Sequence, residues 1–280
     1  MAFYALWMTI SDTLSRTHVL GTKKSIFYFS WVTIYQERND IMENKIVLIV
    51  GGSGGIGSAT AKKFGNAGAK VVLASRNKAN VESVAKEIND AGGEAYAIEV
   101  DATDQTSVEK MAEEISSQLG KIDVLINAFG QGIIQPFLDI DPKDAKEIID
   151  TNVYGTFLVT QTVMKNMNED EPTSIVMFPG TMGKYVMKNA SVYAASKFAI
   201  QGFTKALIEE QRRGKTKFSL LYLGGVDTAF WDDERVNMRV KKDMMLTPDE
   251  VADAVFYAVN QPSGSVMNEV VIQPESHQLV

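Results

Sequence analysis

Two side chains that can carry proton chemistry stand four residues apart in the segment Tyr193-Ala-Ala-Ser-Lys197. At that spacing on a helix both project from one face, so the Lys197 ammonium can lie near the Tyr193 phenol. A neighbouring cation favours phenolate and lowers a phenol pKa that is ordinarily about 10. We therefore expect Tyr193 to give a proton to a carbonyl oxygen or to take one from an alcohol. The alternative is a packed tyrosine beside a solvated surface lysine.

The composition offers few other groups for catalysis. The 280 residues include no cysteine and only two histidines, His18 and His277, near the chain ends. This excludes disulfides, a thiolate nucleophile and cysteine-ligated zinc or iron–sulfur sites, and it leaves no histidine triad in the main body. We expect no metal. A net charge of −7 and a pI of about 5.0 also argue against a general nucleic-acid binder, so no nucleic-acid partner is predicted.

A glycine-rich turn follows the first apolar run of the main body. The residues Gly51-Gly-Ser-Gly-Gly55-Ile-Gly57 separate the run 46–50 from a segment that opens a helix. Glycines let such a turn adopt positive φ and let its backbone approach a pyrophosphate, which the N–H groups of the helix N-terminus can bind. The position between a strand and a helix predicts a dinucleotide site. The alternative is a tight turn without a ligand.

The elements that must position these groups alternate between short β-branched runs and longer amphipathic segments. This pattern indicates a parallel sheet with crossover helices. No repeat or linker divides residues 43–280, so we predict an α/β fold: a single doubly wound Rossmann domain with a seven-stranded parallel sheet flanked by helices on both faces. The predicted strands are 46–50, 70–74, 95–100, 124–127, 174–178, 218–223 and 270–272, and the predicted helices are 56–67, 79–91, 107–119, 142–167, 191–213 and 248–260.

The glycine spacing and the Tyr193-x-x-x-Lys197 pair together resemble the short-chain dehydrogenase/reductase family. The pair opens the predicted helix after the fifth strand, where that family carries its catalytic tyrosine and lysine. Further matches follow in the family's order: "EVDATD" at 99–104, "INAFG" at 126–130, "DTNVYGTF" at 150–157 and "YLGGVDTAF" at 222–230. The resemblance covers about residues 45–273. It implies an enzyme that transfers a hydride between a nicotinamide cofactor and a carbonyl or secondary alcohol.

The resemblance also assigns roles to individual residues. In the family the lysine binds the nicotinamide ribose as well, and an asparagine that matches Asn152 supports a water chain to it. Asn152 as an ordinary polar residue within a helix is the alternative. The candidate catalytic residues are Tyr193, Lys197 and Asn152, with Thr181 added below. The candidate cofactor contacts are Gly51, Ser53, Gly55, Ile56, Gly57, Ser75, Arg76, Asp101, Ala102, Asn127, Tyr193, Lys197, Gly224, Val226 and Thr228.

The end of the second predicted strand bears on the choice of cofactor. NAD-binding proteins of this kind usually place an acidic residue there for the ribose 2′-hydroxyl, whereas NADP-binding ones avoid that charge and add a basic residue. Here Ser75 holds the acidic position and Arg76 follows it. A guanidinium can pair with a 2′-phosphate, so we predict NADP(H). The alternative is a solvent-facing arginine.

Four departures from the family pattern stand out. Val50 replaces a threonine, and Ala128-Phe129 replaces Asn-Ala; both changes mainly alter structural hydrogen bonds. Leu223-Gly224 stands where Pro-Gly is usual and keeps the glycine near the nicotinamide. The fourth is Gly180, which stands 13 residues before Tyr193, where the family usually has a serine.

The missing serine hydroxyl concerns catalysis directly. Losing such a donor can cost about 3–4 kcal/mol, or roughly 100- to 1000-fold in rate. We predict that the adjacent Thr181 supplies the hydroxyl, brought into place by a one-residue shortening of the following loop. The gap also keeps a second class of function open, namely a catalytically weak or inactive NADP(H)-binding protein that acts as a sensor or partner subunit.

Substrate and partners follow from the resemblance only in outline. The segment 229–246 lies where the family keeps its substrate-covering loop, and its basic residues could meet an acidic substrate or acyl carrier, although we favour a solvated face. The motifs fit a 3-oxoacyl thioester, a keto or hydroxy acid, or a related ketone. Family members usually pair through the two long helices near Asn152 and Tyr193, so a homodimer or homotetramer is expected.

The first 41 residues differ in composition from the rest. They hold 8 of the 25 aromatic residues and carry a charge of +1, which leaves −8 for residues 42–280. The run 26–35 is too short and too polar to span a bilayer, so no integral membrane span is expected. Residues 1–41 could be a targeting or peripheral membrane segment, a partner-binding extension, or residues upstream of a true start at Met42, and we favour the last. A cytoplasmic location is expected.

Overall fold

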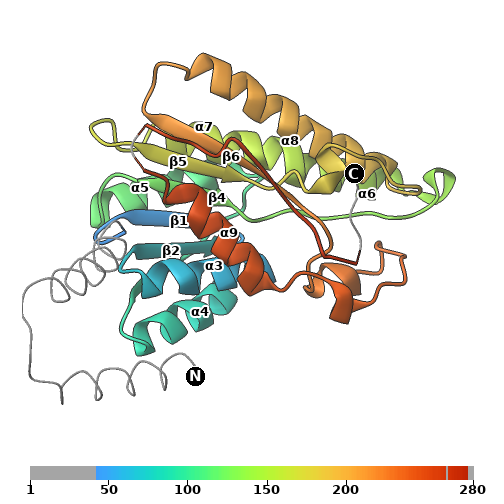
Figure 1. The fold of residues 1–280 in the computed structure, drawn as a ribbon, viewed down its shortest axis with the longest axis horizontal. Helices are drawn as coiled ribbons and strands as arrows, with labels where there is room; N and C mark the ends of the chain where they lie inside the picture. Colours follow the sequence, from blue (N-terminus) through green and yellow to red (C-terminus); the bar gives the residue numbers. More distant parts are fainter. Residues whose placement is uncertain (1–41, 263, 277–280) are drawn as a thin grey trace, which may run out of the picture. The chain divides into compact units, whose positions relative to one another are not determined.

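Seven parallel strands form one sheet within residues 42–262 and 264–276, the part of the chain that the computed structural model describes (Figure 1). The strand order is β3-β2-β1-β4-β5-β6-β7. The chain therefore runs outward from β1 to β3, crosses to β4 on the other side of β1, and continues to β7. Such a reversal of strand order is where doubly wound sheets bind their ligands. The strands are β1 (Ile46–Val50), β2 (Lys70–Ser75), β3 (Glu94–Glu99), β4 (Val124–Asn127), β5 (Thr173–Met177), β6 (Thr216–Leu223) and β7 (Glu269–Ile272).

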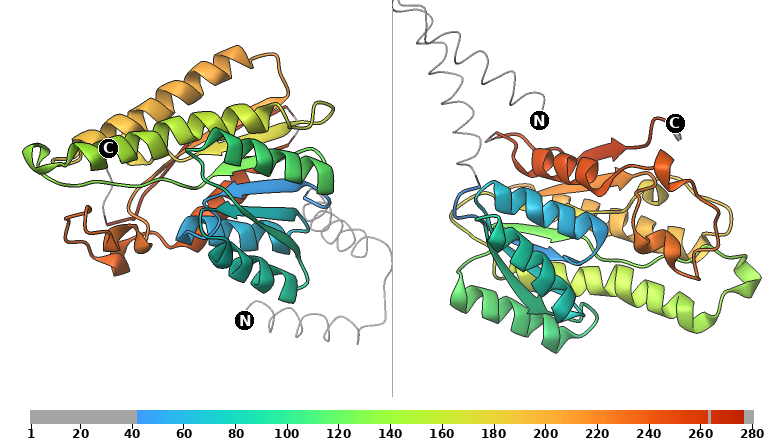
Figure 2. Two further views of the ribbon diagram at one scale, coloured as in Figure 1. Left: turned by 180° about the vertical axis from the view of Figure 1, so that it is seen from behind. Right: turned by 90° about the horizontal axis from the view of Figure 1, so that it is seen from below.

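Helices cover both faces of the sheet, as the views in Figure 2 show. On one face lie α3 (Gly55–Asn66), α4 (Lys78–Asp90) and α9 (Pro248–Val259). On the other lie α5 (Gln105–Gln118), α7 (Thr156–Met164) and α8 (Ser191–Glu210), and α6 (Pro142–Ile149) packs against α8. The predicted α/β fold with a parallel seven-stranded sheet is confirmed.

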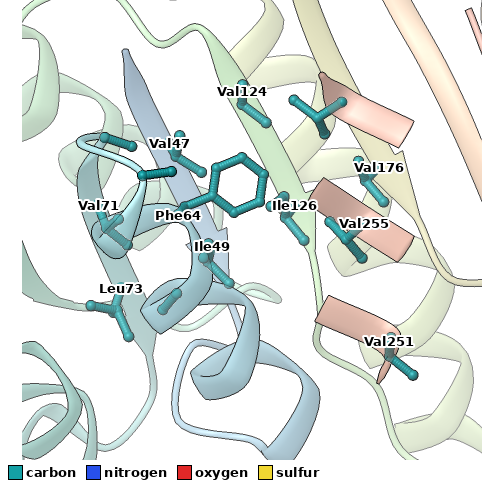
Figure 3. Packing of buried hydrophobic residues seen from close by; sticks show 14 of the residues in the cluster. Val47, Ile49, Phe64, Val71, Leu73, Val124, Ile126, Val176, Val251 and Val255 are labelled. Atoms are coloured by element: carbon teal, nitrogen blue, oxygen red, sulfur yellow. The ribbon is translucent and has the colours of Figure 1, made fainter. Parts of the chain in front are cut away.

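Alternate residues of the strands feed two separate apolar cores. In β1, Val47 and Ile49 pack with Phe64 of α3 and Val255 of α9, as Figure 3 shows. Leu48 and Val50 of the same strand belong to the core on the other face. All five residues of β1 are buried, which explains why this strand reads as a continuous apolar run.

The predicted helix over 142–167 is wrong in one respect. The structure has α6, then a π-helical segment over Asp150–Gly155, then α7, which ends at Met164. A π segment widens the turn and is frequent at functional sites. It brings Asn152 into a buried position. The predicted helix 191–213 also ends earlier, at Glu210, where the polar sequence Gln211-Arg-Arg-Gly214 takes over.

The hypotheses about residues 1–41, and His277, fall outside the described residues. Met42–Val280 groups as one compact unit. Within residues 42–262 and 264–276, no helix has the length and apolar character needed to cross a membrane.

Candidate active site

Tyr193 and Lys197 both belong to the first two turns of α8. The Lys197 Nζ lies 5.6 Å from the centroid of the Tyr193 ring, so the two side chains share a face as their spacing predicts. Lys197 is only 7% exposed. Its ammonium donates a hydrogen bond of 2.9 Å to the carbonyl of Phe178, just beyond β5. A buried lysine held in this way is a positioned cation and not a surface charge.

Burial shifts both groups toward their uncharged forms. It raises the pKa of Tyr193 well above its ordinary value of 10.0 and lowers the pKa of Lys197 from 10.5 to about 8. The spacing in the sequence favours a lowered phenol pKa, but desolvation outweighs the nearby cation here. Tyr193 is therefore protonated at neutral pH, ready to donate its proton, while Lys197 remains mostly charged.

The Asn152 side chain forms hydrogen bonds with the loop after β4 and with α8, both of which are distant from it in sequence. Its Oδ1 accepts the N–H of Gln131 at 2.8 Å, and its Nδ2 donates to the Gln131 carbonyl at 2.8 Å and to the Ser196 hydroxyl at 2.9 Å. Ser196 in turn donates to the Tyr193 carbonyl at 2.7 Å. The amide is fully buried and all three contacts fix its orientation.

Gly130, in the loop that follows β4, lies close to two of the catalytic candidates. A Cβ built on this residue would lie 3.1 Å from the Asn152 Oδ1 and 3.6 Å from the Lys197 Nζ. Both polar groups therefore border the same space. Its φ of +152° and this close approach require glycine. The structure thus brings three of the four catalytic candidates together: Tyr193, Lys197 and Asn152.

The glycines of the turn after β1 are set by close packing of the backbone. Gly51 has a φ of +86°, and a Cβ on it would lie 2.6 Å from the Ala128 carbonyl oxygen beyond β4. A Cβ on Gly57 would lie 2.2 Å from the Gly51 carbonyl oxygen, and one on Gly55 would lie 2.7 Å from the Thr228 Cγ2. The turn therefore joins the ends of β1 and β4 to the segment after β6.

The N-terminus of α3 fits a pyrophosphate. No side chain caps this helix at Gly54, in contrast to α4, α5, α6 and α9, which begin with capping side chains. Helix N-termini leave N–H groups without intrahelical partners, and these groups bind anions. Ser53 and Ile56 lie beside it, both half-buried, and Ile56 packs on the core.

Arg76 lies exposed at the end of β2, on the neighbouring strand to β1. Among the described residues it forms no ion pair within 4.0 Å. Ser75 donates its hydroxyl to the Asn77 carbonyl at 3.0 Å. Asp101 accepts the N–H and the hydroxyl of Thr103, and these bonds, with a weaker contribution from Arg76, lower its pKa. Asp101 therefore orders the turn after β3, close enough to the exposed Arg76 to be influenced by its charge.

Three other cofactor candidates have structural contacts. The Asn127 side chain is buried; its Nδ2 donates to the Thr160 hydroxyl and faces the Met177 sulfur, whereas its Oδ1 has no partner among the described residues. Ala102 is buried, and its carbonyl oxygen lies 3.2 Å from a Cβ built on Gly155. Gly224 donates its N–H to the Ile272 carbonyl at 2.8 Å.

The segment after β6 folds over the glycine-rich turn. Thr228 lies against Gly55, as the close Cβ approach shows, and its hydroxyl accepts the N–H of Phe230 at 3.4 Å. Val226 is buried and its carbonyl accepts the indole N–H of Trp231 at 2.8 Å. The contact with Gly55 places Thr228 beside the N-terminus of α3.

Gly180 adopts a backbone conformation that serine rarely takes. Its φ is +62° and its ψ is 175°, a region populated almost only by glycine. Thr181 follows and begins a short 3-10 helix, Thr181–Gly183, which packs against α8. Thr181 is 8% exposed. The loop geometry explains the glycine, and the role of Thr181 stays a prediction.

Sequence reasoning missed four contributors: Ser196 and Gln131, which hold Asn152, the Phe178 carbonyl, which holds Lys197, and the ring of Phe230. The last lies 5.6 Å from the Tyr193 ring between centroids. Ser196 could have been noticed inside the Tyr193–Lys197 motif, but a backbone carbonyl leaves no sequence signal. Within the described residues, no group of three or more acidic or histidine side chains is placed to hold a metal ion.

Known proteins resemble this chain in sequence and in fold. The family model described as short chain dehydrogenase matches residues 45–239. An uncharacterized oxidoreductase of Staphylococcus epidermidis is 30% identical over 233 residues, which cover 83% of this chain and 98% of the relative. A structure of 3-ketoacyl-(acyl-carrier-protein) reductase from Brucella melitensis with NADH is 28% identical, with a TM-score of 0.75, and covers 84% of this chain and 98% of its own.

A further similar structure is that of a variant of actinorhodin polyketide ketoreductase with NADPH. It is 25% identical with a TM-score of 0.74, and the match covers 82% of this chain and 96% of that one. The family model spans more than half of this chain and ends beyond Tyr193 and Lys197. The chain therefore belongs to the short-chain dehydrogenase family of NAD(P)-dependent oxidoreductases.

Proposed function

We propose that the protein transfers a hydride between NADP(H) and a carbonyl or secondary alcohol, with Tyr193 as the general acid and base. The observation that carries this proposal is the buried Lys197, whose ammonium lies 5.6 Å from the Tyr193 ring. Asn152 borders the same space as Lys197. Gly130, whose surroundings Asn152 and Lys197 share, lies in the loop after β4, one of the two strands between which the strand order reverses.

The proton chemistry follows from the charges of the two groups. A bound reduced nicotinamide supplies the hydride that the carbonyl carbon accepts. Tyr193 donates its proton to the carbonyl oxygen, and its raised pKa ensures that the proton is present at neutral pH. The phenolate left behind is stabilised by the Lys197 ammonium. In the reverse direction the phenolate takes the proton of the alcohol as the hydride leaves.

The preference for NADP(H) rests on Arg76. Its guanidinium is exposed and unpaired within the described residues, next to a strand end with no carboxylate at Ser75. The similar structures do not decide the question, because one holds NADPH and another NADH. An enzyme that turned over NADH at least as efficiently as NADPH would contradict this assignment.

Thr181 is the proposed replacement for the missing serine hydroxyl. It is buried in a turn packed against α8, the helix that carries Tyr193. The φ of Gly180 supports a rebuilt loop over a simple exchange of serine for glycine. A 3-oxoacyl thioester, a keto or hydroxy acid, or a related ketone is the proposed substrate, in line with the ketoreductase and 3-ketoacyl reductase among the similar structures.

Oxidation of NADPH across simple ketones, β-keto acids and β-ketoacyl thioesters tests the proposal. We expect turnover of at least one class, and a loss of roughly 100- to 10,000-fold in kcat for Tyr193→Phe while NADPH still binds. Equal turnover by Tyr193→Phe would contradict the role of the phenol. NADPH binding without turnover of any substrate class would instead favour the alternative, a catalytically weak or inactive NADP(H)-binding protein. That alternative arises because Gly180 lacks the hydroxyl of the usual serine.

Exposed aromatic side chains support the proposed homodimer or homotetramer. Tyr154 and Phe157 are 46% and 39% exposed, and their rings stack with centroids 6.4 Å apart. Apolar surface of this kind is typical of contacts between subunits. Light scattering should give a dimer or tetramer, and Phe157→Glu should shift it toward a monomer. A monomeric parent protein would contradict this.

A further inference from the structure

The ring of Phe230 lies between two other aromatic rings at the active site. Phe230 belongs to a short 3-10 helix, Ala229–Asp232, in the segment after β6. Its ring centroid is 5.6 Å from that of Tyr193, at a tilt of 37°, and 5.1 Å from that of Trp231, edge to face. Trp231 is anchored by its indole N–H, which donates to the Val226 carbonyl. Phe230 therefore packs against Tyr193 on one side and against the anchored Trp231 on another.

The Phe230 ring rests against the backbone of Gly132, in the loop after β4, and we call this contact the seat of the ring. A Cβ built on Gly132 would lie 2.3 Å from both Cε2 and Cζ of Phe230. Contacts this short are far below van der Waals distance, so the ring occupies the place of a side chain at position 132. The half-buried ring contacts Tyr193, Trp231 and the Gly132 backbone.

The segment that carries Phe230 is also fastened to the loop after β4. Ile134 donates its N–H to the Arg235 carbonyl at 2.8 Å, and Asn237 donates to the Ile134 carbonyl at 3.1 Å. The Arg235 guanidinium pairs with Glu147 of α6 at 3.5 Å and donates to the Gln131 Oε1 at 3.3 Å. These contacts hold the ring in one place relative to Tyr193.

We propose that Phe230 determines substrate specificity by limiting the size of one substituent on the carbonyl carbon. This inference rests on the proposed function, because Tyr193 must reach the substrate oxygen by a hydrogen bond. A carbonyl carbon at that distance carries its substituents within a few ångströms of the phenol, where the Phe230 ring already lies. The ring offers no hydrogen bond, so the group beside it is small and apolar.

The first test compares two substrates that differ only at this substituent. Ethyl acetoacetate carries a methyl group on the reacting carbonyl and ethyl benzoylacetate carries a phenyl group. The parent protein should favour the methyl compound, and Phe230→Ala should shift the ratio of the two kcat/KM values toward the phenyl compound by about tenfold or more. Tyr257→Ala, which removes a 60% exposed ring on α9, is the matched control and should leave the ratio unchanged.

The second test needs no turnover. Gly132→Ala should lower the urea midpoint of unfolding in the parent protein, because the new methyl group collides with the ring. In the Phe230→Ala background the same change should have little effect, since the seat is then empty. The φ of Gly132 lies outside the left-handed region, so alanine causes no backbone strain there.

The outcomes separate the two ideas. A ratio that moves less than about twofold in Phe230→Ala, or equally in Tyr257→Ala, would overturn the role of Phe230 while leaving the oxidoreductase proposal intact. An equal effect of Gly132→Ala in both backgrounds would overturn the proposed seat. If the parent protein and Phe230→Ala bind NADPH but reduce neither ester nor any ketone of the wider panel, both proposals are wrong.

Discussion

The turn after β1 and the segment after β6 both border the candidate site, but different contacts hold them. The turn over 51–57 is fixed by backbone packing, with glycines where a Cβ would collide with a carbonyl oxygen or with Thr228. The segment that carries Phe230 and Arg235 is held by side-chain contacts, including a hydrogen bond between residues 104 positions apart in the chain, together with backbone hydrogen bonds to Ile134. Close approach of backbone atoms restricts a position to glycine, whereas contacts between side chains can be made by many combinations of residue types.

This difference explains where chemistry is shared and where it varies. A dinucleotide has a constant pyrophosphate, and backbone N–H groups at a helix N-terminus suit any such ligand. A substrate differs from enzyme to enzyme, so the groups that meet it sit on a segment whose contacts can change without disturbing the sheet.

Thr181→Ala tests whether the Thr181 hydroxyl replaces that of the serine usual at position 180. We expect a loss of roughly 100- to 1000-fold in kcat, or about 3–4 kcal/mol of transition-state stabilisation, because one donor to the substrate oxygen is removed. The binding of NADPH, followed by fluorescence titration, should not change. Full turnover in Thr181→Ala would show that another group holds the oxygen.

Lys197→Met tests the buried cation through stability measured without nucleotide. Folding lowers the Lys197 pKa from 10.5 to about 8, so between these pH values the unfolded chain binds more protons and stability rises with pH. Below about pH 8 the parent protein carries the full penalty, and above 10.5 it carries none. The free energy of unfolding of the parent, relative to Lys197→Met, should therefore rise by up to about 3 kcal/mol across this window.

Urea unfolding of the two proteins at matched pH values measures this difference. Other titrating groups are shared, so they largely cancel. A difference that stays constant with pH would mean that the folded Lys197 keeps an ordinary pKa.

Gly180→Ser tests whether restoring the usual serine at this one position is enough to restore the family arrangement. We expect no gain in activity and a loss of about 1–3 kcal/mol in stability, because the backbone at φ +62° and ψ 175° strains a serine. Thermal or urea unfolding measures the loss, and Gly202→Ser, at an open helical position, serves as the control. A stable and faster Gly180→Ser would show that the loop can adopt the more usual form.

Arg76→Ala tests the cofactor side. Removing the guanidinium should raise the Kd for NADPH by about tenfold, the loss of one charge-assisted contact of roughly 1.4 kcal/mol, and should leave the Kd for NADH unchanged. Equal effects on both cofactors would mean that Arg76 does not meet the 2′-phosphate.

Much of the fold could be predicted from local patterns. The apolar run of β1 and the alternation of strands and helices indicate the parallel sheet, because burial on both faces imposes a readable composition. The π segment at Asn152 could not be predicted, since the sequence around it has ordinary helical periodicity. Its geometry depends on Gln131 and Ser196, which meet Asn152 only in the folded chain.

The family, the sheet and the pair Tyr193 and Lys197 can be inferred from the order of residues, because these depend on spacing along one element or one turn. The protonation of that pair depends on folding, since burial and not the neighbouring charge dominates the pKa of Tyr193. Folding also decides that Gly180 takes a conformation unsuited to serine and that Phe230 rests on Gly132 against Tyr193. Desolvation, backbone strain and ring packing all arise from groups brought together by folding, so no local pattern records them.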